Sequence, residues 1–200
     1  MDVKEWQYMG REKFFELVQE LNKVRKSPYY KKVWLYGTQG YGKSHLLAAL
    51  VCYLAAQDEK VVYIPDCREW LENPVGYIQA ALLFAWADDI TTQKEIVALR
   101  NMDDIMRFVD SQTNVIFVVD QLNALTTNEC SPEEAKKRAK LHDWLVLCLS
   151  SITSVCSTSA NYSEHLKTTV KKSSYIVLHV YGGLTRVSHL QIYVKMRLLT

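Results

Sequence analysis

The feature that most constrains the fold is the eight-residue stretch GTQGYGKS, Gly37 to Ser44. It matches the pattern GxxxxGK[ST], and it stands between an apolar strand expected at 31–36 and a helix expected at 43–57. In that setting the glycines let successive backbone N–H groups point at a phosphate, and the helix N-terminus adds partial positive charge. The stretch therefore predicts a P-loop that binds a nucleoside triphosphate.

Two side chains of this loop are expected to contact the nucleotide and its magnesium ion. Lys43 would reach the β and γ oxygens of the nucleotide, and the Ser44 hydroxyl would bind magnesium. The sequence thus predicts ATP and Mg²⁺ as ligands. The other expected nucleotide contacts are Gly37, Thr38, Gln39, Gly40, Tyr41, Gly42 and His45.

Strands and helices are expected to alternate along the chain, which favours an open parallel α/β sheet with helices on both faces. The apolar strands are expected at 31–36, 60–66, 114–120, 152–157 and 175–180. Helical patterning covers 11–26, 43–57, 68–86, 91–108, 131–149 and 163–172. We expect an N-terminal helix region at 1–30, a nucleotide-binding core at 31–185, and a divergent or truncated C-terminus at 186–200. The last twenty residues contain little that would complete a lid or a further sheet unit.

The second half of the predicted site is an acid that follows a buried strand. Asp120 ends NVIFVVD, the most apolar strand of the chain, and is the expected magnesium ligand. The next residue is Gln121, where many ATPases have a glutamate that acts as general base. A glutamine can orient a water but is a very poor base.

Two other carboxylates are candidates for the general base. Asp66 and Glu69 follow the second core strand, at the sheet edge where ligands sit in open α/β folds. The placement resembles that of the catalytic glutamate in RecA-like and rotary-ATPase cores. An N-cap role for Asp66 and a first-turn role for Glu69 explain the same residues equally well.

The strand at 152–157 runs into polar residues that include Ser157 and Asn161. If this strand lies between the P-loop strand and the Asp120 strand, these groups emerge beside the phosphates, and Asn161 becomes a candidate catalytic residue. A polar loop of ordinary turn formers is the alternative.

The segment Tyr8 to Glu12, YMGRE, resembles the GRE box that precedes many P-loops of the AAA+ and STAND types. In those proteins the backbone near the glycine packs against adenine. Gly10 is therefore a candidate adenine contact.

Composition excludes several classes of protein. The chain has 200 residues, 48% apolar and 23% charged, which describes one globular domain, and its formal net charge of +2 neither indicates nor excludes nucleic-acid binding. The five cysteines form no CxxC pair, so a reducing, intracellular setting is expected. No segment resembles a signal peptide or a membrane span.

Beyond single motifs, the region Tyr8 to Thr185 is similar to the NTPase module of Crinkler-type effectors of filamentous microbes. The segments that carry this resemblance are YMGRE, LYGTQGYGKSHLLAALVCYL, VVYIPDCREW, FVVDQLNAL, and STSAN followed by YGGLT. It implies an additional-strand P-loop fold with strand order 175–180, 31–36, 152–157, 114–120, 60–66. It also implies a downstream toxin-like nuclease or kinase domain, which we do not find in the sequence, and it would allow secretion into a host cell and its nucleus.

Two functions fit these observations. The first is an ATP hydrolase core, in which Gln121 orients water and Asp66 or Glu69 acts as base. The second is a nucleotide-gated interaction module that hydrolyses ATP hardly at all. A GTPase is disfavoured because no NKxD follows the Asp120 strand, and a homo-oligomer could complete the site with an arginine, for which Arg186 is a nominal candidate.

Overall fold

The computed structural model describes residues 5–6, 9–28, 32–37, 40–126, 130–159, 175–179, 187–191 and 194–195. The strands of the central sheet are β3 (Lys32–Gly37), β4 (Lys60–Ile64), β5 (Val115–Val119), β6 (Thr153–Ser159) and β7 (Tyr175–His179). The helices are α1 (Glu12–Lys26), α2 (Lys43–Ala55), α3 (Cys67–Glu72), α4 (Pro74–Ala85), α5 (Ile90–Ala98), α6 (Met102–Ser111) and α7 (Pro132–Cys148), with a 3₁₀ turn, η1, at Leu122–Leu125. Among the described residues, no helix is long and apolar enough to cross a bilayer.

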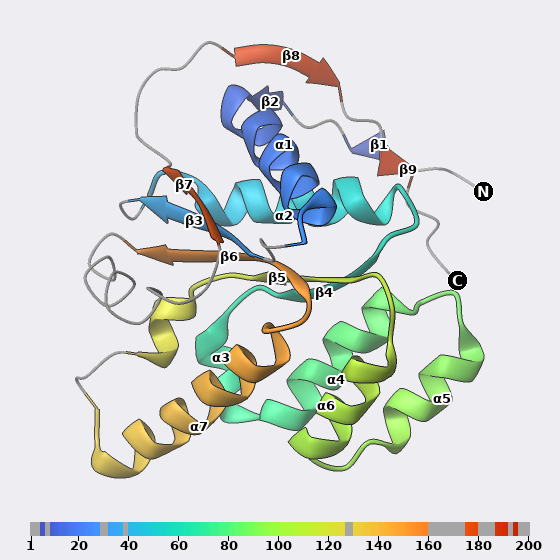
Figure 1. Cartoon of the computed structure of the whole chain (residues 1–200), viewed down its shortest axis with the longest axis vertical. Helices are drawn as coiled ribbons and strands as arrows, with labels where there is room; N and C mark the ends of the chain where they lie inside the picture. The colour runs from blue at the N-terminus through green and yellow to red at the C-terminus, as the bar shows by residue number, and fades with distance from the viewer. Residues whose placement is uncertain are drawn as a thin grey trace.

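The central sheet is open and wholly parallel, with strand order β4-β5-β6-β3-β7 (Figure 1). If these five strands are numbered 1 to 5 along the chain and the sheet is read from β7 to β4, the order is 5-1-4-3-2, as expected from the sequence. The P-loop strand β3 therefore lies between β7 and β6, and β6 separates it from β5. Because the strands are parallel, their carboxyl ends meet at one edge of the sheet.

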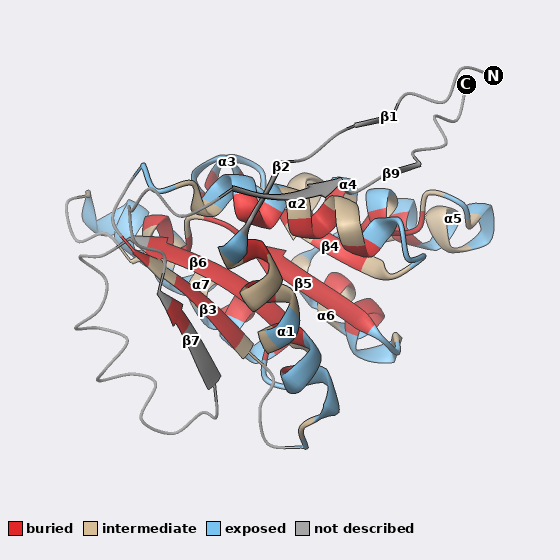
Figure 2. Cartoon of the chain, turned by 90° about the horizontal axis from the view of Figure 1, so that it is seen from above, coloured by how far each residue is buried: buried red, intermediate tan, exposed pale blue. Residues whose placement is uncertain are grey.

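Helices cover both faces of this sheet (Figures 1 and 2). All five residues of β5 are buried: Val115, Phe117 and Val119 join the core formed with α3, α4, α6 and α7, while Ile116 and Val118 join the core formed with α1 and α2. A strand covered on both faces can be apolar at every position, which is why β5 reads as an uninterrupted apolar run. The predicted fold class is confirmed.

Two of the expected helices are each divided in two. The expected helix at 68–86 breaks at Asn73, whose side chain accepts a hydrogen bond from the Gly76 N–H at 3.1 Å and caps α4, which begins at Pro74. The expected helix at 91–108 breaks before Asn101, which caps α6 by accepting from Asp103 and Asp104. The apolar periodicity of the sequence continues across both breaks and does not mark them. The N-caps Asn73 and Asn101 instead set where α4 and α6 begin. The expected helix at 163–172 lies outside the described residues.

Within the last twenty residues, where the sequence offered little to complete a further sheet unit, the structure describes two short strands. Strand β8 (Val187–Gln191) pairs antiparallel with β2 (Met9–Arg11), and β9 (Val194–Lys195) pairs antiparallel with β1 (Glu5–Trp6). These two short ladders are separate from the central sheet. Gly10 of the GRE box thus lies in a strand paired with the C-terminal segment.

Replacing Phe117 with alanine tests this two-sided core. Phe117 is fully buried in β5, so we expect the free energy of unfolding to fall by about 3–5 kcal/mol, from lost burial and the cavity left behind. Urea unfolding monitored by circular dichroism measures this change. Phe84→Ala on α4, where the ring is 53% exposed, is the matched control and should cost less than about 1 kcal/mol. Equal losses in the two variants would contradict the burial of β5.

Candidate nucleotide-binding site

The P-loop starts at Gly37, the last residue of β3, and ends in the first turn of α2. Gly40 and Gly42 have φ of 87° and 81°, in the left-handed region that glycine adopts without strain. Gly42 is the N-cap of α2, with no side-chain cap and no acidic residue in the first turn. Because the N-cap is a glycine, it supplies no side-chain oxygen to the amides that begin α2, and a helix start of this kind is suited to binding an anion. Thr38 and Gln39 lie outside the described residues.

Lys43 is the first residue of α2, and its side chain folds over the loop. Its Nζ donates a hydrogen bond to the Gly37 carbonyl oxygen at 2.8 Å. Partial burial lowers the pKa of this ammonium group, and the nearby Asp120 carboxylate opposes that shift. Both groups lie at the carboxyl edge of the parallel sheet. Ser44, His45 and Tyr41 beside it are exposed.

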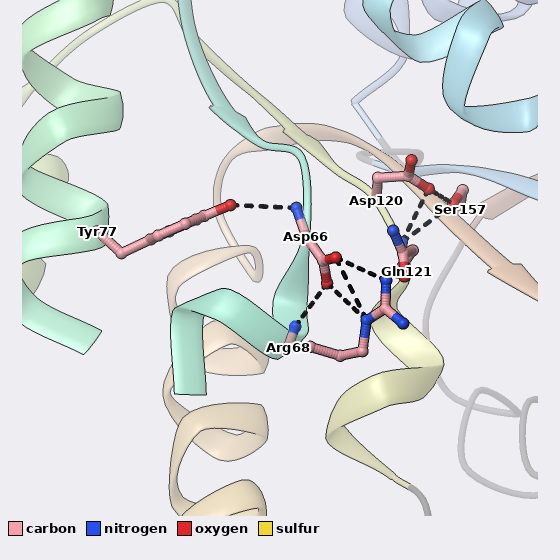
Figure 3. A network of polar contacts seen from close by, with 6 residues as sticks. All are labelled: Asp66, Arg68, Tyr77, Asp120, Gln121 and Ser157. Atoms are coloured by element: carbon pink, nitrogen blue, oxygen red, sulfur yellow. Dashed lines mark hydrogen bonds and ion pairs between the residues drawn. The ribbon is translucent and has the colours of Figure 1, made fainter. Parts of the chain in front are cut away.

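Asp120 is fixed at the end of β5 by its neighbours. Its side chain is only 2% exposed. The Ser157 hydroxyl donates to Oδ1, and the Gln121 N–H donates to the same oxygen at 2.8 Å (Figure 3). The Asp120 N–H donates to the Ile64 carbonyl oxygen at 2.8 Å, extending the β4 pairing. Within the described part of the chain, Oδ2 has no hydrogen-bond donor, so one carboxylate oxygen is available to a cation.

Ser157 is at the carboxyl end of β6, as the sequence predicted for a strand between β3 and β5. The register pairs Val119 with Cys156, so Asp120 and Ser157 follow side by side. Asn161, the other polar candidate on this segment, lies outside the described residues.

Gln121 has an unusual backbone. Its φ of 56° and ψ of 39° are left-handed, and it is the N-cap of η1. Its N–H also lies 3.2 Å from the Ser157 oxygen. This turn places Gln121 at the carboxyl edge of the sheet, next to Asp120.

Asp66 follows β4 and is the N-cap of α3, one of the two roles that the sequence left open for it. Its Oδ1 accepts from the Arg68 N–H at 2.8 Å, and both of its oxygens bind the Arg68 guanidinium, with the shortest contact from Nη2 to Oδ2 at 2.8 Å (Figure 3). The hydrogen-bonded guanidinium lowers the pKa of the Asp66 carboxyl, burial opposes the shift, and the Gln121 side chain adds a smaller lowering effect. Glu69 lies on the exposed side of α3. A carboxylate with a lowered pKa that is held by an arginine is a weak proton acceptor.

The sequence-based interpretation missed two residues of this network. Arg68 was not assigned a role, although an arginine two residues after a helix-capping aspartate can reach back to it. Tyr77 of α4 accepts a hydrogen bond from the Asp66 N–H at 3.1 Å, a contact between elements that no local pattern signals. Arg186 lies outside the described residues.

The groups at this edge match what a triphosphate with magnesium requires. The loop supplies uncapped helix amides and the Lys43 ammonium for phosphate oxygens. The exposed Ser44 hydroxyl and the free oxygen of Asp120 are the hard oxygen donors that Mg²⁺ prefers. When bound, magnesium would neutralise phosphate charge, with Ser44 and Asp120 holding it.

An open parallel sheet, a P-loop between β3 and α2, and an aspartate two strands away define a P-loop NTPase of the additional-strand class. Within that class the chain belongs to the NACHT domain family, which matches residues 31–193. The match agrees with the predicted STAND-like class, and it is not specific to Crinkler effectors.

A solved structure entitled "Structure of Drosophila ORC bound to DNA" has a similar fold. The TM-score is 0.55 at 15% sequence identity, over 82% of this chain and 42% of that one. The chain therefore spans less than half of that protein, and the similarity concerns the fold alone. A comparison with curated proteins finds no match.

Proposed function

We propose that this chain binds ATP with Mg²⁺ and hydrolyses it slowly. The observation that carries the proposal is the placement of Lys43, at the start of α2 after β3, and of buried Asp120, at the end of β5, at the same carboxyl edge of the parallel sheet. Family membership supports nucleotide binding and hydrolysis in general.

Each residue of the site has a role in this proposal. The loop from Gly37 to Ser44 holds the phosphates, Ser44 and Asp120 hold magnesium, and Gln121 orients the attacking water. Glu69 is the better candidate for the base, because Asp66 is held by Arg68 and the pKa of its carboxyl is lowered. His45 and Gly10 are proposed nucleotide contacts, with Gly10 near the adenine.

The second candidate function is a nucleotide-gated interaction module with little hydrolysis. Gln121 favours it, since the position after Asp120 offers no general base. In either case the domain would act within a larger assembly. A Crinkler-like effector context, a homo-oligomer and an arginine from a neighbouring subunit are proposals that rest on the sequence resemblance alone.

Steady-state phosphate release separates the two functions. We expect the isolated chain to turn over at about one per minute or less, because Gln121 cannot act as a base and an arginine finger, worth about 10³-fold or more, is not assigned within this chain. Glu69→Gln should remove most of this residual rate while MgATP affinity is unchanged. The rate of phosphate release by Lys43→Ala, which lacks the proposed phosphate-binding lysine, defines the background rate of the assay.

Two results would count against this account. A rate indistinguishable from the Lys43→Ala background would favour the nucleotide-gated module. Brisk turnover that Glu69→Gln does not change would mean that the catalytic groups are wrongly assigned.

A further inference from the structure

Arg68 is an exposed cation whose geometry is fixed. It is the second residue of α3, and its side chain is 67% exposed. Two of its nitrogens, Nε and Nη2, bind the Asp66 carboxylate, at 3.1 Å and 3.3 Å from Nε and 2.8 Å from Nη2. An arginine normally loses considerable rotamer freedom when it binds a ligand. Here the bidentate pair has already restricted that freedom.

The unused donors of Arg68 lie at the nucleotide edge. A guanidinium has five N–H donors in one plane. Within the described part of the chain, Nη1 has no acceptor. Figure 3 draws Arg68 and Gln121 in one network of polar contacts, and Gln121 is the residue that follows the proposed magnesium ligand Asp120. Gln121 in turn is anchored by its N–H to Asp120 and Ser157.

The partner that fits these donors is a planar or tetrahedral anion. Arginine recognises phosphate through parallel N–H donors, and such charge-assisted bonds are the strong ones. A γ-phosphate held by the P-loop, and by magnesium bound to Asp120, would bring negative charge to the edge of the sheet where Arg68 lies. A diphosphate lacks this third phosphate.

We propose that Arg68 binds the γ-phosphate and makes the site prefer ATP to ADP, with Asp66 as the residue that positions it. This inference rests on the proposed function and deepens it, because it assigns the recognition of the third phosphate to a residue outside the P-loop. It also gives Asp66 a task other than that of a base.

Equilibrium binding of MgATP and MgADP, each measured by calorimetry, tests the proposal. Arg68→Ala should weaken MgATP binding by about tenfold to a hundredfold, the range of lost hydrogen bonds to charged groups, and change MgADP binding less than about twofold. Asp66→Asn should shift the same ratio in the same direction by a smaller factor, because an asparagine still accepts from Arg68 and caps α3. Arg68→Lys should restore only part of the preference, because it lacks the planar fork.

The matched control is Arg107→Ala on α6, where a 77% exposed arginine pairs with Asp104 at 2.6 Å. It should change neither affinity. Equal weakening of MgATP and MgADP by Arg68→Ala, or no change in either, would overturn the proposal and leave the proposed function intact. Failure of the wild-type chain to bind either nucleotide would overturn both.

Discussion

Replacing Lys43 with alanine is expected to lower the affinity for MgATP by at least about a hundredfold. The ammonium group would make charge-assisted contacts to two phosphate oxygens, each worth about 1.5–3 kcal/mol, and an alanine makes neither. The rest of the cradle is backbone, so no other side chain of the loop replaces this charge. Titration with a fluorescent ATP analogue measures the loss.

The control for this variant is Lys23→Ala on α1, which removes an exposed lysine paired with Glu20. It should bind the analogue as the wild type does. The circular dichroism spectra of the two variants should match, since Lys43 is at a helix start and outside both apolar cores. Unchanged binding by Lys43→Ala would refute the P-loop assignment.

Replacing Asp120 with asparagine is expected to abolish the magnesium dependence of ATP binding. An asparagine oxygen can still accept from the Ser157 hydroxyl and the Gln121 N–H, so the turn after β5 should persist. The negative charge that attracts the cation is lost. A titration of MgCl₂ at fixed ATP should show about tenfold or more enhancement in the wild type and less than about twofold in the variant.

Asp103→Asn is the matched control, because Asp103 is an exposed acid in the first turn of α6. It should keep the full magnesium response. An identical response in wild type and Asp120→Asn would remove Asp120 from the proposed magnesium site.

The fold and the centre of the site could be predicted because their signals are local. The P-loop pattern requires a strand before it and a helix after it, and β3 and α2 occupy those places. Asp120 could be predicted because an acid that directly follows a wholly buried strand must emerge at the edge of the sheet. The strand order then placed Ser157 beside it.

The remaining features depend on contacts that sequence patterns do not encode. The pairing of β8 with β2 joins short segments nearly 180 residues apart that lack a clear apolar alternation. The Asp66–Arg68 pair depends on side-chain rotamers, and the Tyr77 contact depends on how α4 packs against β4. The sequence gives an N-cap signal for Asp66 but no signal that its carboxylate holds an arginine.

Hydrogen exchange measured by mass spectrometry, with and without MgATP, tests the central claim most directly. The account predicts slower exchange in peptides that cover the start of α2, Lys43 to Leu47, and the turn at Asp120 and Gln121. The peptide that covers α5, Ile90–Ala98, should not change. No protection at the start of α2, or protection confined to other segments, would contradict the claim that this chain binds ATP through its P-loop.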